Sequence, residues 1–148
     1  MGFRVVKSRQ SIMKPELYLI RGISGSGKTT MAYMLHSWFS SIGKSSVMYS
    51  ADDYFTNPTT GVYYFNTEKL KEAHEQCQLN VDDAMYDKID RIIVHNTFTR
   101  RWEIEPYLEL AQKKHDYEVF EMICNNRFQN VHEVPDEKVK QQLNRFEM

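Results

Sequence analysis

The chain has 148 residues, of which 41% are hydrophobic and 26% are charged, the proportions of a soluble globular protein. This length suits one domain with a core of its own, and a net charge of −1 excludes a general attraction to nucleic acid, so a polyanion site must be a local basic patch. No apolar run approaches the roughly 20 residues of a membrane span, and the N-terminus lacks the apolar core of a signal peptide. We therefore expect a soluble, cytoplasmic protein that contacts no membrane, placed in the host cytoplasm if its source is viral.

The first fifteen residues differ in character from the rest. Residues 1–15 are basic and weakly patterned, which predicts a loose basic arm ahead of a single domain formed by residues 16–148. The apolar run in residues 16–21 has the length and composition of a buried parallel strand.

A glycine-rich stretch follows this strand and fits the P-loop pattern G-x-x-x-x-G-K-[ST] at every required position. A strand before it and a helical pattern after it argue against a chance match. The backbone N–H groups of such a turn form an anion site at the positive end of a helix dipole. Lys28 would reach the β- and γ-phosphates of ATP, and the Thr29 hydroxyl would hold Mg²⁺. The residues expected to bind the nucleotide are Gly22, Ser24, Gly25, Ser26, Gly27, Lys28, Thr29 and Thr30.

The next segment predicts a helix to about residue 41, which a glycine at position 43 would end. Its apolar side chains Met31, Met34, Leu35 and Trp38 recur at the spacing of one helix face, which we expect to meet the core.

Two acids follow the predicted second strand, residues 46–50. A kinase needs a carboxylate near the γ-phosphate, either to accept the proton of an attacking hydroxyl or to help hold Mg²⁺. Asp52 is well placed for both roles, whereas Asp53 is as readily interpreted as the cap of a turn.

A turn at residues 56–61 leads to the aromatic run 62–65, which we expect to form a core staple; a wall for a planar substrate is the alternative. Asn66 or Thr67 would then cap a long helix ending near residue 88. His74 lies on its apolar face, and because the spacing is not that of a zinc motif, a packed histidine is the favoured interpretation.

The remaining pattern alternates strands with helices. Strands are predicted at 91–95 and 118–123, separated by a helix over 100–114 that Thr99 would cap. After a polar segment, Pro135 would open a last helix. Such alternation predicts an α/β fold with a parallel sheet, and ligands of such sheets bind beyond the carboxyl ends of the strands. There the P-loop, Asp52 with Asp53, and Asn96 with Thr97 would meet.

These stretches carry a family resemblance. They resemble the P-loop kinases of the polynucleotide 5′-hydroxyl kinase family, including the kinase domain of bacteriophage polynucleotide kinase, and more remotely the zeta-toxin kinases. The resemblance rests on the segments 21–30, 50–55, 61–65, 69–74, 96–97, 102–107 and 134–135. It implies a P-loop NTPase three-layer sandwich with strand order 2-3-1-4, and transfer of the γ-phosphate of ATP to a 5′-hydroxyl end. Asp52 matches the family's general base, and Lys28 and Thr29 match its phosphate and metal residues.

Three positions depart from the family pattern. Phe55 stands where the phage enzyme has an arginine that contacts the acceptor side, and His95 stands where an acid often ends the third strand. Arg127 lies in the lid segment but is displaced from the family's lid arginine, so Arg100 and Arg145 are alternatives for that catalytic role.

The sequence thus favours an ATP-dependent kinase whose partner is a nucleic-acid 5′ end or a small hydroxyl acceptor. A nucleoside or metabolite kinase is the first alternative. An ATP-binding regulatory protein without turnover is the second, to which His95 and Phe55 lend weight.

Overall fold

The computed structural model describes residues 14–125 and 136–148. Four parallel strands form one sheet in the order β2-β3-β1-β4, as the family resemblance implied. The strands are β1 (Glu16–Arg21), β2 (Ser46–Tyr49), β3 (Arg91–Asn96) and β4 (Glu118–Ile123). The basic arm predicted for residues 1–15 lies almost wholly outside the described residues.

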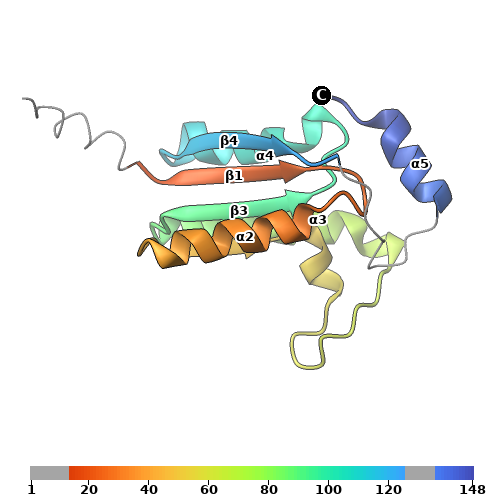
Figure 1. Ribbon diagram of the computed structural model, residues 1–148, viewed down its shortest axis with the longest axis horizontal. Helices are drawn as coiled ribbons and strands as arrows, with labels where there is room; N and C mark the ends of the chain where they lie inside the picture. The colour runs from red at the N-terminus through yellow and green to blue at the C-terminus, as the bar shows by residue number, and fades with distance from the viewer. Residues whose placement is uncertain (1–13, 126–135) are drawn as a thin grey trace, which may run out of the picture.

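The two central strands are buried on both faces, which explains their continuous apolar runs. Leu17, Leu19 and Ile20 of β1 have no exposed surface, and neither do Ile92 and Ile93 of β3. Because β1 lies between β3 and β4, the P-loop that follows it emerges near the middle of the sheet's carboxyl edge (Figure 1).

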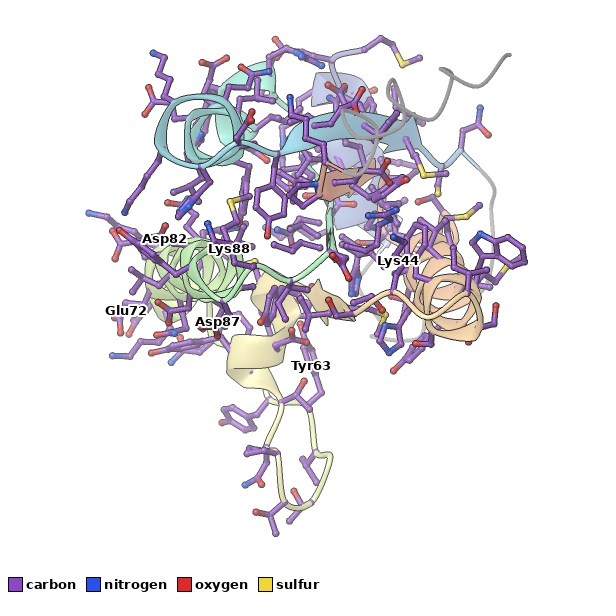
Figure 2. The ribbon with its side chains drawn as sticks, turned by 90° about the vertical axis from the view of Figure 1, so that its left-hand side faces the viewer. Lys44, Tyr63, Glu72, Asp82, Asp87 and Lys88 are labelled. Carbon is purple, nitrogen blue, oxygen red and sulfur yellow. The ribbon has the colours of Figure 1, made fainter. Side chains whose placement is uncertain are left out.

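Helices cover both faces of the sheet and give the predicted three layers. Viewed along the sheet, α3 (Leu70–Tyr86) and α4 (Glu105–Glu109) lie on one face and α2 (Lys28–Ser41) on the other (Figure 2). Leu17 and Leu19 pack toward α3 and α4, whereas Ile20 and Ile93 pack against α2. Among the described residues, no helix combines the length and apolar character needed to cross a membrane.

The buried face of α2 differs from the predicted one. Ala32 and Phe39 are its buried residues, with Met31 and Leu35 packed beside them. Met34 and Trp38, which were expected to face the core, are 62% and 59% exposed. The helix is rotated about its axis relative to the predicted orientation. Apolar residues lie on several sides of Leu35, so the positions of the apolar residues alone do not determine which side faces the core.

The helix predicted over residues 100–114 is divided into three pieces. These are a 3₁₀ turn η3 (Arg101–Glu103), the short α4, and a π-turn η4 (Leu110–Lys114). The prediction that Thr99 caps this helix was wrong: the residue before η3 is Arg100, with no side-chain cap, and the buried Thr99 hydroxyl donates to Glu103 Oε2 at 3.3 Å.

The remaining elements frame the carboxyl edge of the sheet. A 3₁₀ turn η1 (Ala51–Phe55) follows β2, and a second, η2 (Thr67–Lys69), leads into α3. Asn66, one of the two caps predicted for the long helix, caps the preceding η2, its side chain accepting the Glu68 N–H at 3.0 Å, and α3 follows after Lys69 with no side-chain cap. The last helix, α5 (Asp136–Arg145), lies beyond the strand ends (Figure 1); Pro135, its predicted first residue, is outside the described residues.

Candidate functional site

The loop between β1 and α2 has the glycine geometry of a phosphate cradle. A Cβ on Gly22 would lie 2.3 Å from Ser26 Oγ and 2.5 Å from the Cys124 carbonyl oxygen, so a side chain has no room there. Gly27 precedes α2 with a φ of 97°, a left-handed conformation that favours glycine. The loop therefore turns tightly onto the first turn of α2, where a helix offers unpaired N–H groups to an anion.

Lys28 lies across this loop. Its ammonium group donates to the Ile23 carbonyl oxygen at 3.0 Å. Burial lowers the pKa of Lys28 to about 8, while the charges of Asp52 and Cys124 oppose that shift. Thr29 and Thr30 are exposed at the start of α2, and the buried Ser26 hydroxyl has no hydrogen-bond partner among the described residues.

The two acids after β2 have different surroundings. Ser50 begins η1, its N–H donates to Asp53 Oδ2 at 3.0 Å, and its hydroxyl accepts the Asp52 N–H at 3.1 Å. This reciprocal arrangement is a capping box. Burial raises the pKa of Asp53, although the Ser50 amide acts in the opposite direction. Asp53 therefore holds the turn, in agreement with its interpretation as a cap.

Asn96 ties this turn to the neighbouring strand. It ends β3 and is buried, and its side-chain oxygen accepts the Ala51 N–H at 2.8 Å and the Ser50 hydroxyl at 3.3 Å. On the other side of the strand end, the Gly22 N–H donates to the Thr97 carbonyl oxygen at 3.2 Å. The three turns that the sequence placed together are thus joined by hydrogen bonds around the end of β3.

The aromatic run behaves as a core staple only in part: Tyr63 is half-buried, whereas Val62 and Phe65 are 60% and 45% exposed. Tyr63 and Phe65 stack at 6.5 Å between ring centroids, and Phe55 meets Phe65 edge-on at 5.0 Å. Tyr64, in contrast, is 79% exposed. The Tyr63 hydroxyl donates to Asp52 Oδ1 at 3.2 Å. Figure 2 shows Tyr63 at the top of the projecting loop that follows η1.

The last helix closes the opposite side of the P-loop. Gln142 Oε1 accepts the Ser24 N–H at 2.8 Å, and Arg145 Nε donates to Thr99 Oγ1 at 3.1 Å. Arg100 pairs with Glu147 at 3.0 Å, while Arg145 has no carboxylate partner within the part of the chain that the structure describes. Arg127, the predicted lid arginine, lies outside the described residues.

A buried arginine anchors the tail that follows α5. Arg21, at the end of β1, has no exposed surface; its guanidinium pairs with Glu121 at 3.0 Å and donates to the Phe98 carbonyl oxygen at 2.9 and 3.1 Å. It also donates to the Glu147 carbonyl oxygen and lies 4.8 Å from the centroid of the Phe146 ring. This one side chain joins the strand ends to the tail.

Only two residues, Thr29 and Asp52, were expected to hold Mg²⁺. Across residues 14–125 and 136–148, no group of three or more His, Cys, Asp or Glu side chains is placed to bind a metal. Mg²⁺ is commonly held by one or two protein oxygens together with substrate phosphates and water. The exposed Thr29 hydroxyl beside the P-loop and the Asp52 carboxylate fit that mode.

Sequence reasoning missed several residues of this site. It named Asn96 and Asp52 because polar residues after strands are visible in a pattern. It did not identify Tyr63 as a partner of Asp52, because that contact depends on how a loop closes, nor Gln142 as a partner of the P-loop, because that contact joins segments 118 residues apart in the chain. One contact of the site did leave a signal in the sequence: Arg21, a charged residue directly after an apolar run, is the buried arginine that anchors the tail.

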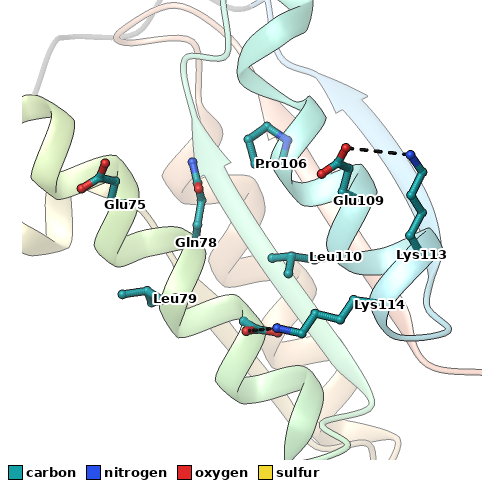
Figure 3. A pocket seen from close by; sticks show the side chains of 9 residues that line it. Glu75, Gln78, Leu79, Pro106, Glu109, Leu110, Lys113 and Lys114 are labelled. Carbon is teal, nitrogen blue, oxygen red and sulfur yellow. Dashed lines mark hydrogen bonds and ion pairs between the residues drawn. The ribbon is translucent and has the colours of Figure 1, made fainter.

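A second hollow lies away from this edge of the sheet. A groove of about 820 Å³ runs between α3 and the α4–η4 segment (Figure 3). Ion pairs cross or border it, Lys114 with Asp82 at 2.8 Å and Lys113 with Glu109 at 3.9 Å. None of the residues expected to bind ATP lines this groove.

Solved structures share this fold. A chain of the Pnkp1/Rnl/Hen1 complex aligns with a TM-score of 0.56 at 16% identity, covering 86% of this chain and 38% of that one. A putative kinase from Chloroflexus aurantiacus aligns with a TM-score of 0.57 at 16% identity, covering 75% of this chain and 59% of that one. The APS kinase CysC of Mycobacterium tuberculosis, solved with AMPPNP and APS, aligns with a TM-score of 0.60 at 14% identity, covering 90% and 77%. At these identities the likeness establishes the fold alone.

Sequence comparison reaches further. The human NEDD4-binding protein 2 is 34% identical over 153 residues, a match that covers 97% of this chain but only 8% of the human protein. Residues 17–148 match the family described as an AAA domain, AAA_33, which spans the whole sheet, the P-loop and α5. The chain therefore belongs to this AAA domain family of P-loop proteins.

Proposed function

We propose that this protein is an ATP-dependent kinase that transfers the γ-phosphate to a hydroxyl acceptor. The observation that carries the proposal is the junction of the P-loop and the Asp52 turn at the end of β3: the Gly22 N–H donates to the Thr97 carbonyl oxygen at 3.2 Å, and Asn96 accepts the Ala51 N–H at 2.8 Å. Asp53 and Asn96 make the capping contacts of the turn, and the Asp52 carboxylate beside them accepts the Tyr63 hydroxyl.

Each part of the site has a task in phosphoryl transfer, which depends mainly on positioning and on stabilising charge. The loop amides and Lys28 would hold the phosphates, and Lys28 would exchange the Ile23 carbonyl for a phosphate oxygen. Thr29 and Asp52 would hold Mg²⁺, which neutralises charge on the phosphates. Asp52 would orient the acceptor hydroxyl and accept its proton.

We favour the 5′-hydroxyl end of a polynucleotide as acceptor. Two considerations support it: the family resemblance of the P-loop together with segment 50–55, and the fold shared with a chain of the Pnkp1/Rnl/Hen1 RNA repair complex. A small-molecule acceptor is the alternative, and the fold shared with APS kinase favours it.

Binding of ATP without turnover is the second candidate function. It is favoured by His95, a half-buried residue of β3 that lies in register with Ile20 of β1, at a position where related kinases often carry an acid. The kinase assay below separates the two functions.

An arginine is expected to neutralise charge on the transferring group. Arg127 is our first choice from its place before α5. Arg145 is the better alternative to Arg100, because Arg100 is already paired with Glu147. If Arg127→Ala retains turnover and Arg145→Ala abolishes it, the role belongs to Arg145.

The test is γ-phosphate transfer to a panel of 5′-hydroxyl oligonucleotides, nucleosides and small alcohols, comparing Asp52→Asn with wild type. Asp52→Asn keeps the shape of the side chain and removes the base, so kcat should fall by about 10²–10⁴-fold while ATP affinity changes little.

Asp53→Asn is the matched control. It should weaken the cap of η1 and lower stability by about 1 kcal/mol, with kcat nearly kept. If Asp53→Asn is the inactive variant, the two acids are assigned in reverse order. If wild type binds ATP but phosphorylates no acceptor on the panel, the non-catalytic function replaces the kinase.

A further inference from the structure

The loop after η1 returns to its own starting point and delivers Tyr63 to Asp52. Thr56 and Tyr63 form an antiparallel bridge, and the Tyr64 N–H donates to the Phe55 carbonyl oxygen at 2.8 Å. Within the loop closed by these backbone contacts, the Tyr63 ring stacks on the Phe65 ring and meets the Phe55 ring edge-on, with 6.4 Å between the Tyr63 and Phe55 ring centroids. The ring is therefore fixed by backbone and by neighbours before its hydroxyl is considered.

The fixed Tyr63 ring places its hydroxyl as a hydrogen-bond donor to the Asp52 carboxylate. The Tyr63 hydroxyl lies 3.2 Å from Asp52 Oδ1, and Tyr63 is half-buried, so the contact is partly shielded from water. Asp53, one residue along, takes its hydrogen bond from the Ser50 backbone instead. The two neighbouring carboxylates thus have different donors, one from the turn and one from the aromatic loop.

We propose that Tyr63 is a positioning residue that sets the orientation of the Asp52 carboxylate for proton acceptance. This inference rests on the proposed kinase function. A charge-assisted hydrogen bond to one carboxylate oxygen fixes the rotation of the group and directs the other oxygen along a defined line. A base held in this way keeps near-attack geometry toward the acceptor hydroxyl, which an unheld carboxylate would sample only part of the time.

The loop therefore has a function beyond packing. Phe55 and Phe65 fix the position of the Tyr63 ring, and the Tyr63 hydroxyl in turn fixes the orientation of the Asp52 carboxylate. This arrangement explains why an aromatic staple stands next to a catalytic turn, at a distance from the main core, in a cluster formed by Ala51, Phe55, Ala73 and Tyr63.

Tyr63→Phe is the decisive variant, because it keeps the ring stack and removes only the hydroxyl. Loss of a hydrogen bond to a charged group should lower kcat by about ten- to a hundredfold. The KM for ATP and the melting temperature should stay near their wild-type values. Tyr64→Phe is the matched control: it removes a hydroxyl from the adjacent, 79% exposed ring and should leave kcat unchanged.

A double-mutant cycle separates positioning from a general structural effect. In an Asp52→Asn background, Tyr63→Phe should cause no further loss of kcat, since the group it positions is already gone. Equal losses in both backgrounds would show that Tyr63 acts elsewhere and would overturn the inference, as would a Tyr63→Phe enzyme as fast as wild type.

A readout independent of turnover tests the contact itself. The ¹³C resonance of the Asp52 carboxyl carbon, assigned by its loss in Asp52→Asn, should shift between wild type and Tyr63→Phe and not in Tyr64→Phe. An unchanged resonance overturns the inference even in an active enzyme. A wild type that phosphorylates no acceptor overturns the kinase function together with this inference, whatever the resonance shows.

Discussion

At the scale of single residues, Lys28 is the side chain that the proposed function assigns to the phosphates of ATP. Its ammonium already has an acceptor in the Ile23 carbonyl, and burial lowers its pKa to about 8. Under the proposed function, its contribution to ATP binding would therefore be the difference between a phosphate oxygen and a carbonyl oxygen as partner. The charge on the phosphate makes that difference favourable.

We expect Lys28→Ala to weaken ATP binding about tenfold or more, since a hydrogen bond to a charged group contributes roughly 1.5–3 kcal/mol. The fold should be kept. Calorimetry with ATP–Mg²⁺ measures the affinity, with Lys113→Ala as control, a surface lysine on the groove between α3 and η4. Equal affinities for Lys28→Ala and wild type would contradict nucleotide binding at this loop.

At the scale of elements, the P-loop depends on a close approach between the end of β1 and the end of β4. Gly22 lies against the Cys124 carbonyl oxygen, and the Cys124 N–H donates to the Arg21 carbonyl oxygen at 2.7 Å. The backbone at this point cannot move away without breaking the sheet's last contact. The tightness of the loop is thus a property of two strand ends together.

Gly22→Ala should therefore damage both stability and nucleotide binding. Its Cβ would meet a backbone oxygen at 2.5 Å, and overpacking of this kind costs about 1–3 kcal/mol. Urea unfolding and ATP titration measure the two effects. Gly43→Ala is the control: its Cβ meets no atom within 4 Å, but its φ of 79° is unfavourable for alanine, so stability should fall while ATP affinity stays unchanged.

Local patterns predicted the elements well where hydrophobic runs and capping residues determine them. All four strands, the P-loop turn and the Asn66 cap follow from such runs. The rotation of α2 and the division of residues 100–114 into three helical pieces did not, because they depend on which neighbours fill the space. In the site, Asp52 could be predicted from its place after a strand, whereas its partner Tyr63 depends on the closure of a loop.

At the scale of the whole molecule, Arg21 connects the sheet to the tail that follows α5, the helix that contacts the P-loop through Gln142. It is fully buried, and its partners come from β4, from the turn after β3 and from residues 146–147. A buried charge with this many partners is costly to disturb, because removing it leaves Glu121 without one of its two arginines and frees the tail carbonyl.

Arg21→Met should lower the free energy of unfolding by about 3–5 kcal/mol, which for a protein of this size corresponds to a melting temperature roughly 10 °C lower. Arg101→Met removes the other partner of Glu121 from a half-exposed ion pair and should cost at most about 1 kcal/mol. Similar losses in the two variants would show that the tail is not held through Arg21.

The order of the strands also sets the distance between the P-loop and the turn that carries Asp52. Because β3 lies between β1 and β2, and neighbouring strands are about 4.8 Å apart, the two turns that supply Lys28 and Asp52 start about 10 Å from each other. A phosphoryl group with a hydroxyl oxygen about 3–3.5 Å from its phosphorus fits within such an interval. Backbone pairing maintains this interval whatever the surrounding side chains are. Under the proposed kinase function, discrimination between a large acceptor and a small one would then come from the segments that extend past the strand ends, among them the projecting loop after η1 (Figure 1).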